Sequence, residues 1–213
     1  MTRLNFDPWN VENGGLSMSM KSAAVEIRLL SYWHIGSGYG RGAEVDALVL
    51  TDSNGLPYIP GRSLKGVFRE ASQNCEDVGL LERGRTWHLF GRPSEKGEYD
   101  GSTPGALFFR DACLKEEDRA CLVPESKRAF RNALFDTLAS TSVNQDGVGE
   151  DHTLRTIQVC VPVTLFSEIT SEEESFSHDL EKAAVLIRGI GSRRNRGLGR
   201  CEVVILKGGH RDG

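Results

Sequence analysis

The fold of this chain depends on residues 56–66, Leu-Pro-Tyr-Ile-Pro-Gly-Arg-Ser-Leu-Lys-Gly, where an extended stretch runs into a helix. Pro57 and Pro60 hold the residues before them in extended conformations. A helix is then expected from Arg62 or Ser63 to about Cys75. Its apolar residues recur at helical spacing: Leu64, Val67, Phe68 and Ala71. The start of such a helix leaves backbone N–H groups free to bind an anion.

Further elements are expected on both sides of this helix. Apolar patterning predicts strands over 21–33, 106–112, 154–169 with a bend at Pro162, and 201–206, an extended segment over 46–51, helices over 126–140 and 174–190, and a short element at 86–91. Glycine at every second position from Gly36 to Gly42 predicts that residues 34–43 hold no packed element.

The order of these elements predicts an α+β fold. Strand, helix, strand, strand, helix, strand is the β-α-β-β-α-β core of a ferredoxin-like (RRM-like) domain, here with long insertions. We expect an irregular leader over residues 1–20 and a single domain over 21–213, with insertions at about 77–104 and 136–155.

Composition favours a globular cytoplasmic protein. The 213 residues are 38% hydrophobic and 26% charged, and no apolar run is long enough to cross a bilayer, so no membrane partner is expected. The N-terminus lacks the pattern of a secretory signal. Five scattered cysteines without a Cys-x-x-Cys pair predict neither a zinc site nor a disulfide framework, and they fit a reducing cytoplasm.

Charge is segregated along the chain although the net charge is −4. Acidic residues gather at 172–174, whereas basic residues gather at 62–69 and 193–200. A basic track on an otherwise acidic protein is one way to bind a polyanion.

A second glycine-bearing segment, residues 189–200, reads Gly-Ile-Gly-Ser-Arg-Arg-Asn-Arg-Gly-Leu-Gly-Arg. Its glycines allow close approach of another chain, and its arginines are forked donors suited to phosphate. The two basic segments and a polar tip near residue 150 supply the candidate residues for binding a polyanion: Arg62, Ser63, Lys65, Arg69, Gly191, Arg193, Arg194, Arg196, Gly197 and His152. The plain alternatives are a solvated loop and a surface helix with Ser63 as N-cap.

Together these segments resemble those of the RAMP superfamily of CRISPR proteins. Ile59–Gly66 stands where that family has its Pro-Gly motif, and Gly191–Gly199 where it has a glycine-arginine loop. Residues 44–57, 109–112 and 141–163 resemble, in order, the stretch before the motif, the central strand and a projecting thumb hairpin of type III backbone subunits. The resemblance covers about residues 22–206.

The resemblance implies a backbone subunit of a type III CRISPR ribonucleoprotein. Such a subunit binds guide RNA, contacts neighbouring backbone subunits and the large subunit, and cleaves complementary target RNA as an endoribonuclease. The implied catalytic residue is Asp46, which would also bind Mg²⁺ or Mn²⁺ together with RNA phosphates.

A ferredoxin-like binding module unrelated to CRISPR is the plainest alternative, and two others remain open. The chain is either a structural subunit that does not cut, or a stand-alone enzyme that processes guide RNA with His34 or His152 in acid–base roles. His34 is more typical of a packed histidine. Tyr39 is a candidate for stacking on a base, whereas Trp33 is expected in the core.

Overall fold

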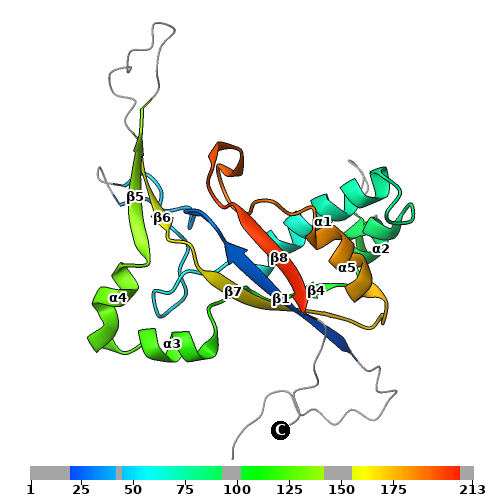
Figure 1. Ribbon diagram of the computed structural model, residues 1–213, viewed down its shortest axis with the longest axis horizontal. Coiled ribbons are helices and arrows are strands. Elements are labelled where there is room, and N and C mark those ends of the chain that lie inside the picture. The colour runs from blue at the N-terminus through cyan, green and yellow to red at the C-terminus, as the bar shows by residue number, and fades with distance from the viewer. Residues whose placement is uncertain (1–19, 42–44, 93–101, 142–154, 207–213) are drawn as a thin grey trace, which may run out of the picture.

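The computed structural model describes residues 20–41, 45–92, 102–141 and 155–206 (Figure 1). Its helices and strands, in chain order, are β1 (Lys21–Leu29), α1 (Gly61–Asp77), α2 (Arg85–Phe90), β2 (Gly91–Arg92), β3 (Thr103–Pro104), β4 (Phe108–Phe109), α3 (Glu116–Leu122), the 3₁₀ turn η1 (Glu125–Lys127), α4 (Arg128–Asn132), β5 (Phe135–Ser140), β6 (Arg155–Cys160), β7 (Thr164–Ser171), α5 (Phe176–Ala184), the 3₁₀ turn η2 (Arg194–Arg196) and β8 (Cys201–Leu206).

Four of these strands form one antiparallel sheet in the order β4-β7-β1-β8. Strand β1 lies between β7 and β8, so that Val25 is opposite both Ser167 and Ile205. With α1 after β1 and α5 after β7, this is the ferredoxin-like arrangement, and the predicted fold class is confirmed. Figure 1 shows α1 and α5 together on one side of the sheet.

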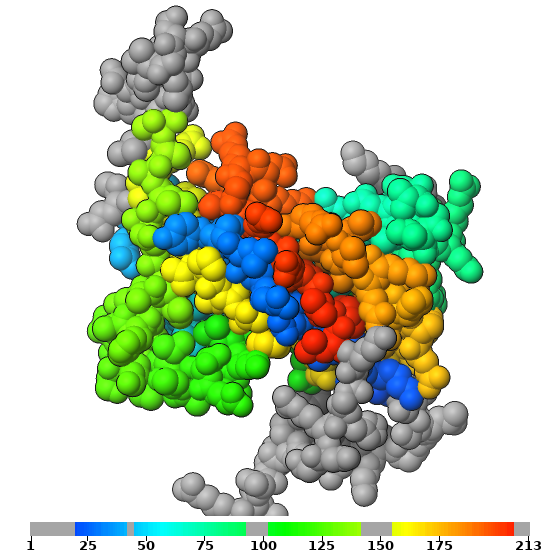
Figure 2. Space-filling view, in the orientation of Figure 1, coloured from blue at the N-terminus to red at the C-terminus, as the bar shows by residue number. Residues whose placement is uncertain are grey.

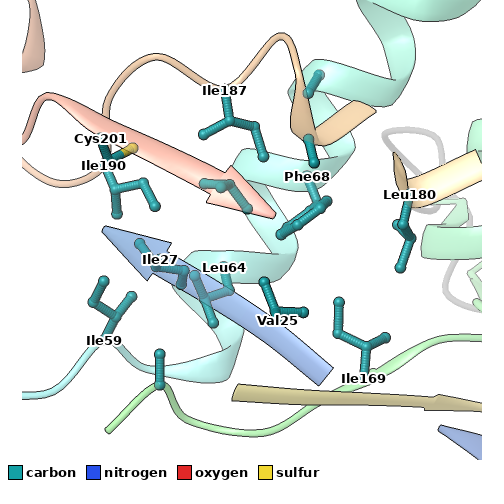
Figure 3. Packing of buried hydrophobic residues seen from close by; sticks show 14 of the residues in the cluster. Val25, Ile27, Ile59, Leu64, Phe68, Ile169, Leu180, Ile187, Ile190 and Cys201 are labelled. Carbon is teal, nitrogen blue, oxygen red and sulfur yellow. The ribbon is translucent and has the colours of Figure 1, made fainter. Parts of the chain in front are cut away.

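The core lies between the sheet and these two helices (Figure 3). Alternate residues of β1 are buried, from Ala23 to Leu29, because successive side chains of a strand point to opposite faces. They meet Leu64 and Phe68 of α1 and Leu180 of α5, each at most 1% exposed. Each such side chain contributes about 1.5–3 kcal/mol by leaving water, so this layer fixes the helices on the sheet.

Helix α1 begins one residue earlier than predicted, at Gly61, and Ser63 is not its cap. The Gly61 N–H donates to Oδ1 of Asp111 at 2.7 Å. A β-carbon at Gly61 would lie 2.2 Å from the carbonyl oxygen of Phe109. The glycine of the Pro-Gly motif therefore serves close packing of α1 on the β4 segment, and a carboxylate of the chain itself occupies the helix N-terminus.

The predicted helix over 126–140 is wrong in its second half. Helical structure ends at α4, and residues 135–140 form strand β5, paired with β6 from Phe135↔Cys160 to Ser140↔Arg155. Pairing with a segment distant in sequence has overridden the local helical periodicity. The hairpin of β5 and β6 projects from the body of the molecule (Figure 1).

Two predicted strands are divided. Residues 154–169 form β6 and β7, which lie in different sheets on either side of Pro162, because proline cannot donate to a ladder. The strand predicted over 106–112 is regular only at β4, with further bridges at Ala112 and Cys113. The later helix is shorter than 174–190, whereas the final strand spans 201–206 as predicted.

Among the described segments, none of the helices has the length and apolar character needed to cross a membrane.

Candidate nucleic-acid interface

The glycine-rich stretch after β1 forms no helix or regular strand over its described residues, as predicted for residues 34–43, and residues 36–41 are mostly exposed. Residues 35–41 run against 45–50 as an irregular hairpin, with hydrogen bonds from Ser37 N to Leu48 O at 3.0 Å and from Arg41 N to Val45 O at 2.7 Å. A β-carbon at Gly40 would lie 2.8 Å from the Asp46 carbonyl oxygen. Glycine at this position therefore permits close pairing of the two arms.

Asp46 lies on the second arm, exposed and attached to the β5–β6 hairpin. Its N–H donates to Thr156 O at 2.8 Å, and its Oδ2 accepts from Thr156 N at 2.7 Å. The next residue, Ala47, forms a parallel bridge with Ile157. Residues 45–49 thus line the edge of β6 that is not occupied by β5, and the carboxylate is held beside the first residues of β6.

Gln158 joins this arm to the segment after β1. Its side-chain Oε1 accepts from Val49 N at 3.0 Å, and its carbonyl oxygen accepts from His34 Nδ1 at 2.7 Å. His34 is 5% exposed, and its Nδ1 must carry the proton because a carbonyl can only accept. This is the packed histidine expected from the sequence.

The glycine-arginine loop is docked on the same segment. Ser192 N donates to His34 O at 2.8 Å, and Gly199 N donates to Tyr32 O at 2.7 Å. Gly191 and Gly199 have φ of 96° and 67°, and a β-carbon would approach backbone oxygens to 2.5 and 1.9 Å. These two glycines are therefore explained by contacts within the protein, whereas Gly197 (φ 88°) has open space around it.

The three predicted arginines of this loop have different environments. Arg194 forms a two-pronged ion pair with Glu70 of α1, at 2.8 and 2.9 Å. Arg193, in a left-handed conformation with φ 55°, reaches Ser140 Oγ of β5 at 3.4 Å. Arg196 is exposed. In Figure 2 this orange-red surface lies between the green hairpin and the helical side of the molecule.

The carboxylate and the loop both contact one end of the hairpin, where Ser140 pairs with Arg155. Asp46 is bound to Thr156 of β6, and Arg193 contacts the hydroxyl of Ser140 on β5, which pairs with Arg155. The arm that carries Asp46 and strand β5 lie on either side of β6, so they are about two strand spacings, or about 10 Å, apart. Tyr39, 75% exposed, belongs to the arm that precedes Asp46.

The predicted residues of α1 do not join this surface. Lys65 Nζ donates to Leu107 O at 3.4 Å and Arg69 donates to Gly91 O, both on the side of β4. Glu70 faces the opposite way, toward Arg194. Arg62 is exposed at the first turn. Lys65 and Arg69 therefore lie on the opposite side of α1 from the glycine-arginine loop.

Two further predictions have other outcomes. His152 lies outside the described residues. Sequence reasoning missed the Tyr32–Asp136 contact, in which the phenol donates to Oδ2 at 3.0 Å and the hydrogen bond raises the pKa of Tyr32. No sequence signal marks this contact, because 104 residues separate the partners.

A resident divalent metal is not supported by the described side chains, where no group of three or more His, Cys, Asp and Glu residues converges. Asp46 offers one carboxylate, and its Oδ2 already accepts from Thr156. A Mg²⁺ or Mn²⁺ ion needs several oxygen ligands. Most of them would have to come from RNA phosphates and water.

Comparison with known proteins supports the architecture. A chain of the cryo-EM structure of the type III-B Cmr-beta bound to cognate target RNA superposes with a TM-score of 0.66 at 14% identity, covering 87% of this chain and 97% of that chain. A chain of the apo-state structure gives 0.60 at 13% identity, with the same coverage. At these identities the likeness is one of fold. A search of curated proteins finds no match.

The sequence itself matches the RAMP superfamily over residues 26–202, which include the Pro-Gly motif, the β5–β6 hairpin and the glycine-arginine loop. This span also contains β4 and β7 of the sheet, with part of β1 and the start of β8. The chain therefore belongs to the RAMP superfamily.

Proposed function

We propose that this chain is a backbone subunit of a type III CRISPR ribonucleoprotein that binds guide RNA and cleaves complementary target RNA. The observation that carries the proposal is that Asp46 and Arg193 both contact the Ser140–Arg155 end of the projecting hairpin, with the exposed Arg196 in the same loop as Arg193. The RAMP match and the fold shared with Cmr-beta chains support it. Its partners would be guide RNA, target RNA, neighbouring backbone subunits and the large subunit.

Guide binding would rest on phosphates and shape. Arg193 and Arg196 supply forked donors for phosphate oxygens, and Tyr39 supplies an exposed ring for stacking. Neither kind of contact reads base identity, which suits a subunit that must accept any guide sequence.

Asp46 would act as the base in cleavage. Its Oδ1 accepts the proton of a ribose 2′-hydroxyl, and the 2′-oxygen attacks the adjacent phosphorus as the bond to O5′ breaks. The products are a 2′,3′-cyclic phosphate and a 5′-hydroxyl, whose proton comes from water. The hydrogen bond from Thr156 N to Oδ2 would hold the carboxylate in place for this in-line step.

The test uses the assembled complex with guide and labelled target RNA. Asp46→Asn keeps an oxygen that can accept from Thr156 N but loses the base, so target cleavage should fall at least about 100-fold with guide affinity unchanged. Asp118→Ala, which removes an exposed carboxylate on α3, is the matched control. Full cleavage by Asp46→Asn would contradict the catalytic role. The same cleavage assay with a chelator present shows whether target cleavage needs a divalent cation.

Guide binding is tested on Arg196→Ala. The exposed Arg196 should contribute to RNA affinity without affecting stability, so the variant should bind more weakly and melt at the wild-type temperature. Unchanged affinity in both Arg196→Ala and Arg193→Ala would contradict guide binding by this loop.

A structural subunit that does not cut is the second candidate. The contact favouring it is the Asp46–Thr156 pair, which by itself explains an aspartate at this position. Retained guide binding with no cleavage by the wild-type complex would support it. A stand-alone processing enzyme using His34 is disfavoured because that imidazole is buried and bonded to Gln158 O.

A further inference from the structure

Strand β6 shares the edge away from β5 between two segments that are distant in sequence. Residues 45–49 bond to the first part of this edge, up to the hydrogen bond from Gln158 N to Ala47 O at 2.9 Å. The segment after β1 takes over at the end of the strand, with bonds in both directions between Trp33 and Cys160, at 2.8 and 3.0 Å. Gln158 lies at the changeover between the two segments.

At this changeover the side chain of Gln158 does the work of its backbone carbonyl. In a parallel pair, a residue donates to one residue of the neighbouring segment and accepts from another further along. Gln158, whose N–H donates to Ala47 O, would therefore accept from Val49 N through its carbonyl. That carbonyl instead accepts from His34 Nδ1 at 2.7 Å, and the side-chain Oε1 accepts from Val49 N at 3.0 Å. The amide side chain thus replaces an acceptor that the imidazole occupies.

The bond to Val49 fixes the arm that carries Asp46. Val49 is 4% exposed, so an N–H left without the Gln158 oxygen would lack a partner unless the arm moved away from β6. The Asp46 carboxylate lies on the same arm and is itself bonded to Thr156 of β6. An arm released at Val49 would therefore loosen the position of the carboxylate as well.

We propose that Gln158 is a positioning residue for Asp46: its side-chain oxygen holds the arm against β6 and thereby sets the place of the carboxylate. This role rests on the proposed function, in which the carboxylate is the base, and adds to it a residue that acts through Asp46 and not on the RNA. In-line attack needs the reacting atoms in a near-attack arrangement, and a misplacement of about 1 Å can lower a rate about 100-fold. The Gln158 oxygen is therefore expected to affect the rate of cleavage more than the affinity for RNA.

The first experiment measures target cleavage by the assembled complex, as the rate at saturating target RNA and the target concentration that gives half of that rate. Gln158→Met keeps the length of the side chain but removes the oxygen, so the saturated rate should fall about 10- to 100-fold with the half-saturating concentration unchanged. Gln158→Glu keeps an oxygen at the same position along the side chain, so its saturated rate should stay within about twofold of wild type. Repulsion of RNA by the added charge would raise only the half-saturating concentration.

Ser167→Ala is the matched control for the loss of one hydrogen bond. Ser167 Oγ donates to Arg110 O at 2.7 Å, and the residue lies on β7, in the four-stranded sheet and not in the hairpin. Like Gln158→Met, this variant removes a bond between a side chain and the backbone, but on a strand that does not carry the Asp46 arm. It should cleave target RNA at the wild-type rate.

The second experiment measures the hold on the arm without RNA, by amide hydrogen exchange of the full chain followed by NMR. The N–H groups of Val49 and Thr156 should exchange about tenfold faster or more in Gln158→Met and at the wild-type rate in Gln158→Glu. Val49 reports the bond to Gln158, whereas Thr156 reports the carboxylate, because its N–H donates to Asp46 Oδ2. Ser167→Ala should leave both exchange rates unchanged.

The outcomes separate the positioning role from the proposed function. Wild-type cleavage or wild-type exchange at Thr156 in Gln158→Met would overturn the positioning role, and so would equal losses in Gln158→Met and Gln158→Glu or in Ser167→Ala. Full cleavage by Asp46→Asn would overturn the proposed function instead, and exchange at Thr156 would then decide alone whether Gln158 positions the carboxylate. Thermal melting checks folding. If Gln158→Met does not fold, Gln158→Asn replaces it with the same expected losses, because its oxygen lies one methylene short of Val49 N.

Discussion

Substituting Gly61 by alanine tests whether the Pro-Gly motif serves packing. The added β-carbon would lie 2.2 Å from Phe109 O and 2.9 Å from the carbonyl carbon of the same residue. Since both atoms belong to backbone, no side-chain rotation relieves the overlap. Helix α1 would have to move by about 1 Å to reach ordinary contact distance.

That movement has two costs. Overpacking in a filled core costs about 1–3 kcal/mol of unfolding free energy. The shift also strains the 2.7 Å hydrogen bond from Gly61 N to the Asp111 carboxylate, of a kind worth about 1.5–3 kcal/mol. We expect Gly61→Ala to lose about 3 kcal/mol in urea unfolding followed by circular dichroism. For a chain of this length the melting temperature should fall by about 6–12 °C.

Gly66→Ala is the matched control on the same helix. A β-carbon at Gly66 meets nothing within 4 Å, so alanine should stabilise the helix by about 0.5–1 kcal/mol. Opposite signs for the two variants are the expected result. Equal stability of Gly61→Ala and Gly66→Ala would refute the packing account. Gly61 would then be better explained by close approach of RNA to the helix N-terminus.

Three further predictions concern charge and cysteine chemistry. The Arg85 guanidinium, hydrogen-bonded to Glu173, lowers the pKa of that carboxyl to about 2. The stability it adds is therefore present above the unfolded pKa of about 4.3 and is lost as pH falls toward 2, so the melting-temperature gap between wild type and Glu173→Gln should narrow between pH 6 and pH 2.5; a constant gap would contradict it. A double-mutant cycle on Arg194 and Glu70 should give a coupling of about 0.2–1 kcal/mol, because the pair is largely exposed, and a value near zero would show that it does not hold the loop. Burial raises the pKa of Cys160 to about 12, so iodoacetamide at pH 8 should label the exposed Cys121 and spare Cys160 in mass spectra of the folded chain; equal labelling would contradict that burial.

Periodicity in the sequence was sufficient for the elements that form the core. The stripe from Leu64 to Ala71 predicted α1, and the alternation in residues 201–206 predicted β8, because each element buries one face against the same core. The prediction was wrong for residues 135–140, which pair with a strand 15 or more residues away in sequence. Residues 35–41 have no regular element, as predicted, but their hydrogen bonds with residues 45–50 are not visible in local composition.

For the candidate site, the sequence predicts Asp46 and the arginines as functional residues but does not predict their contacts. Composition treated the loop arginines as equivalent, whereas Arg194 is paired with Glu70 and Arg196 is exposed. The glycines were assigned to approach by RNA, yet Gly191 and Gly199 are required by carbonyl groups of the protein itself. The pairing of Arg194 with Glu70 and the contact of Gly191 with His34 O join segments more than 100 residues apart, for which a single sequence carries no signal.

The two hydrogen bonds between Asp46 and Thr156 couple the position of the Asp46 carboxylate to that of the β5–β6 hairpin. Both the amide and Oδ2 of Asp46 are bonded to one residue of β6, so a swing of β5 and β6 carries the carboxylate along with it. A partner that binds the hairpin and moves it would therefore also move the Asp46 carboxylate. The proposed cleavage would then depend on assembly of the complex, because the Asp46 carboxylate would not be correctly positioned in the unassembled chain.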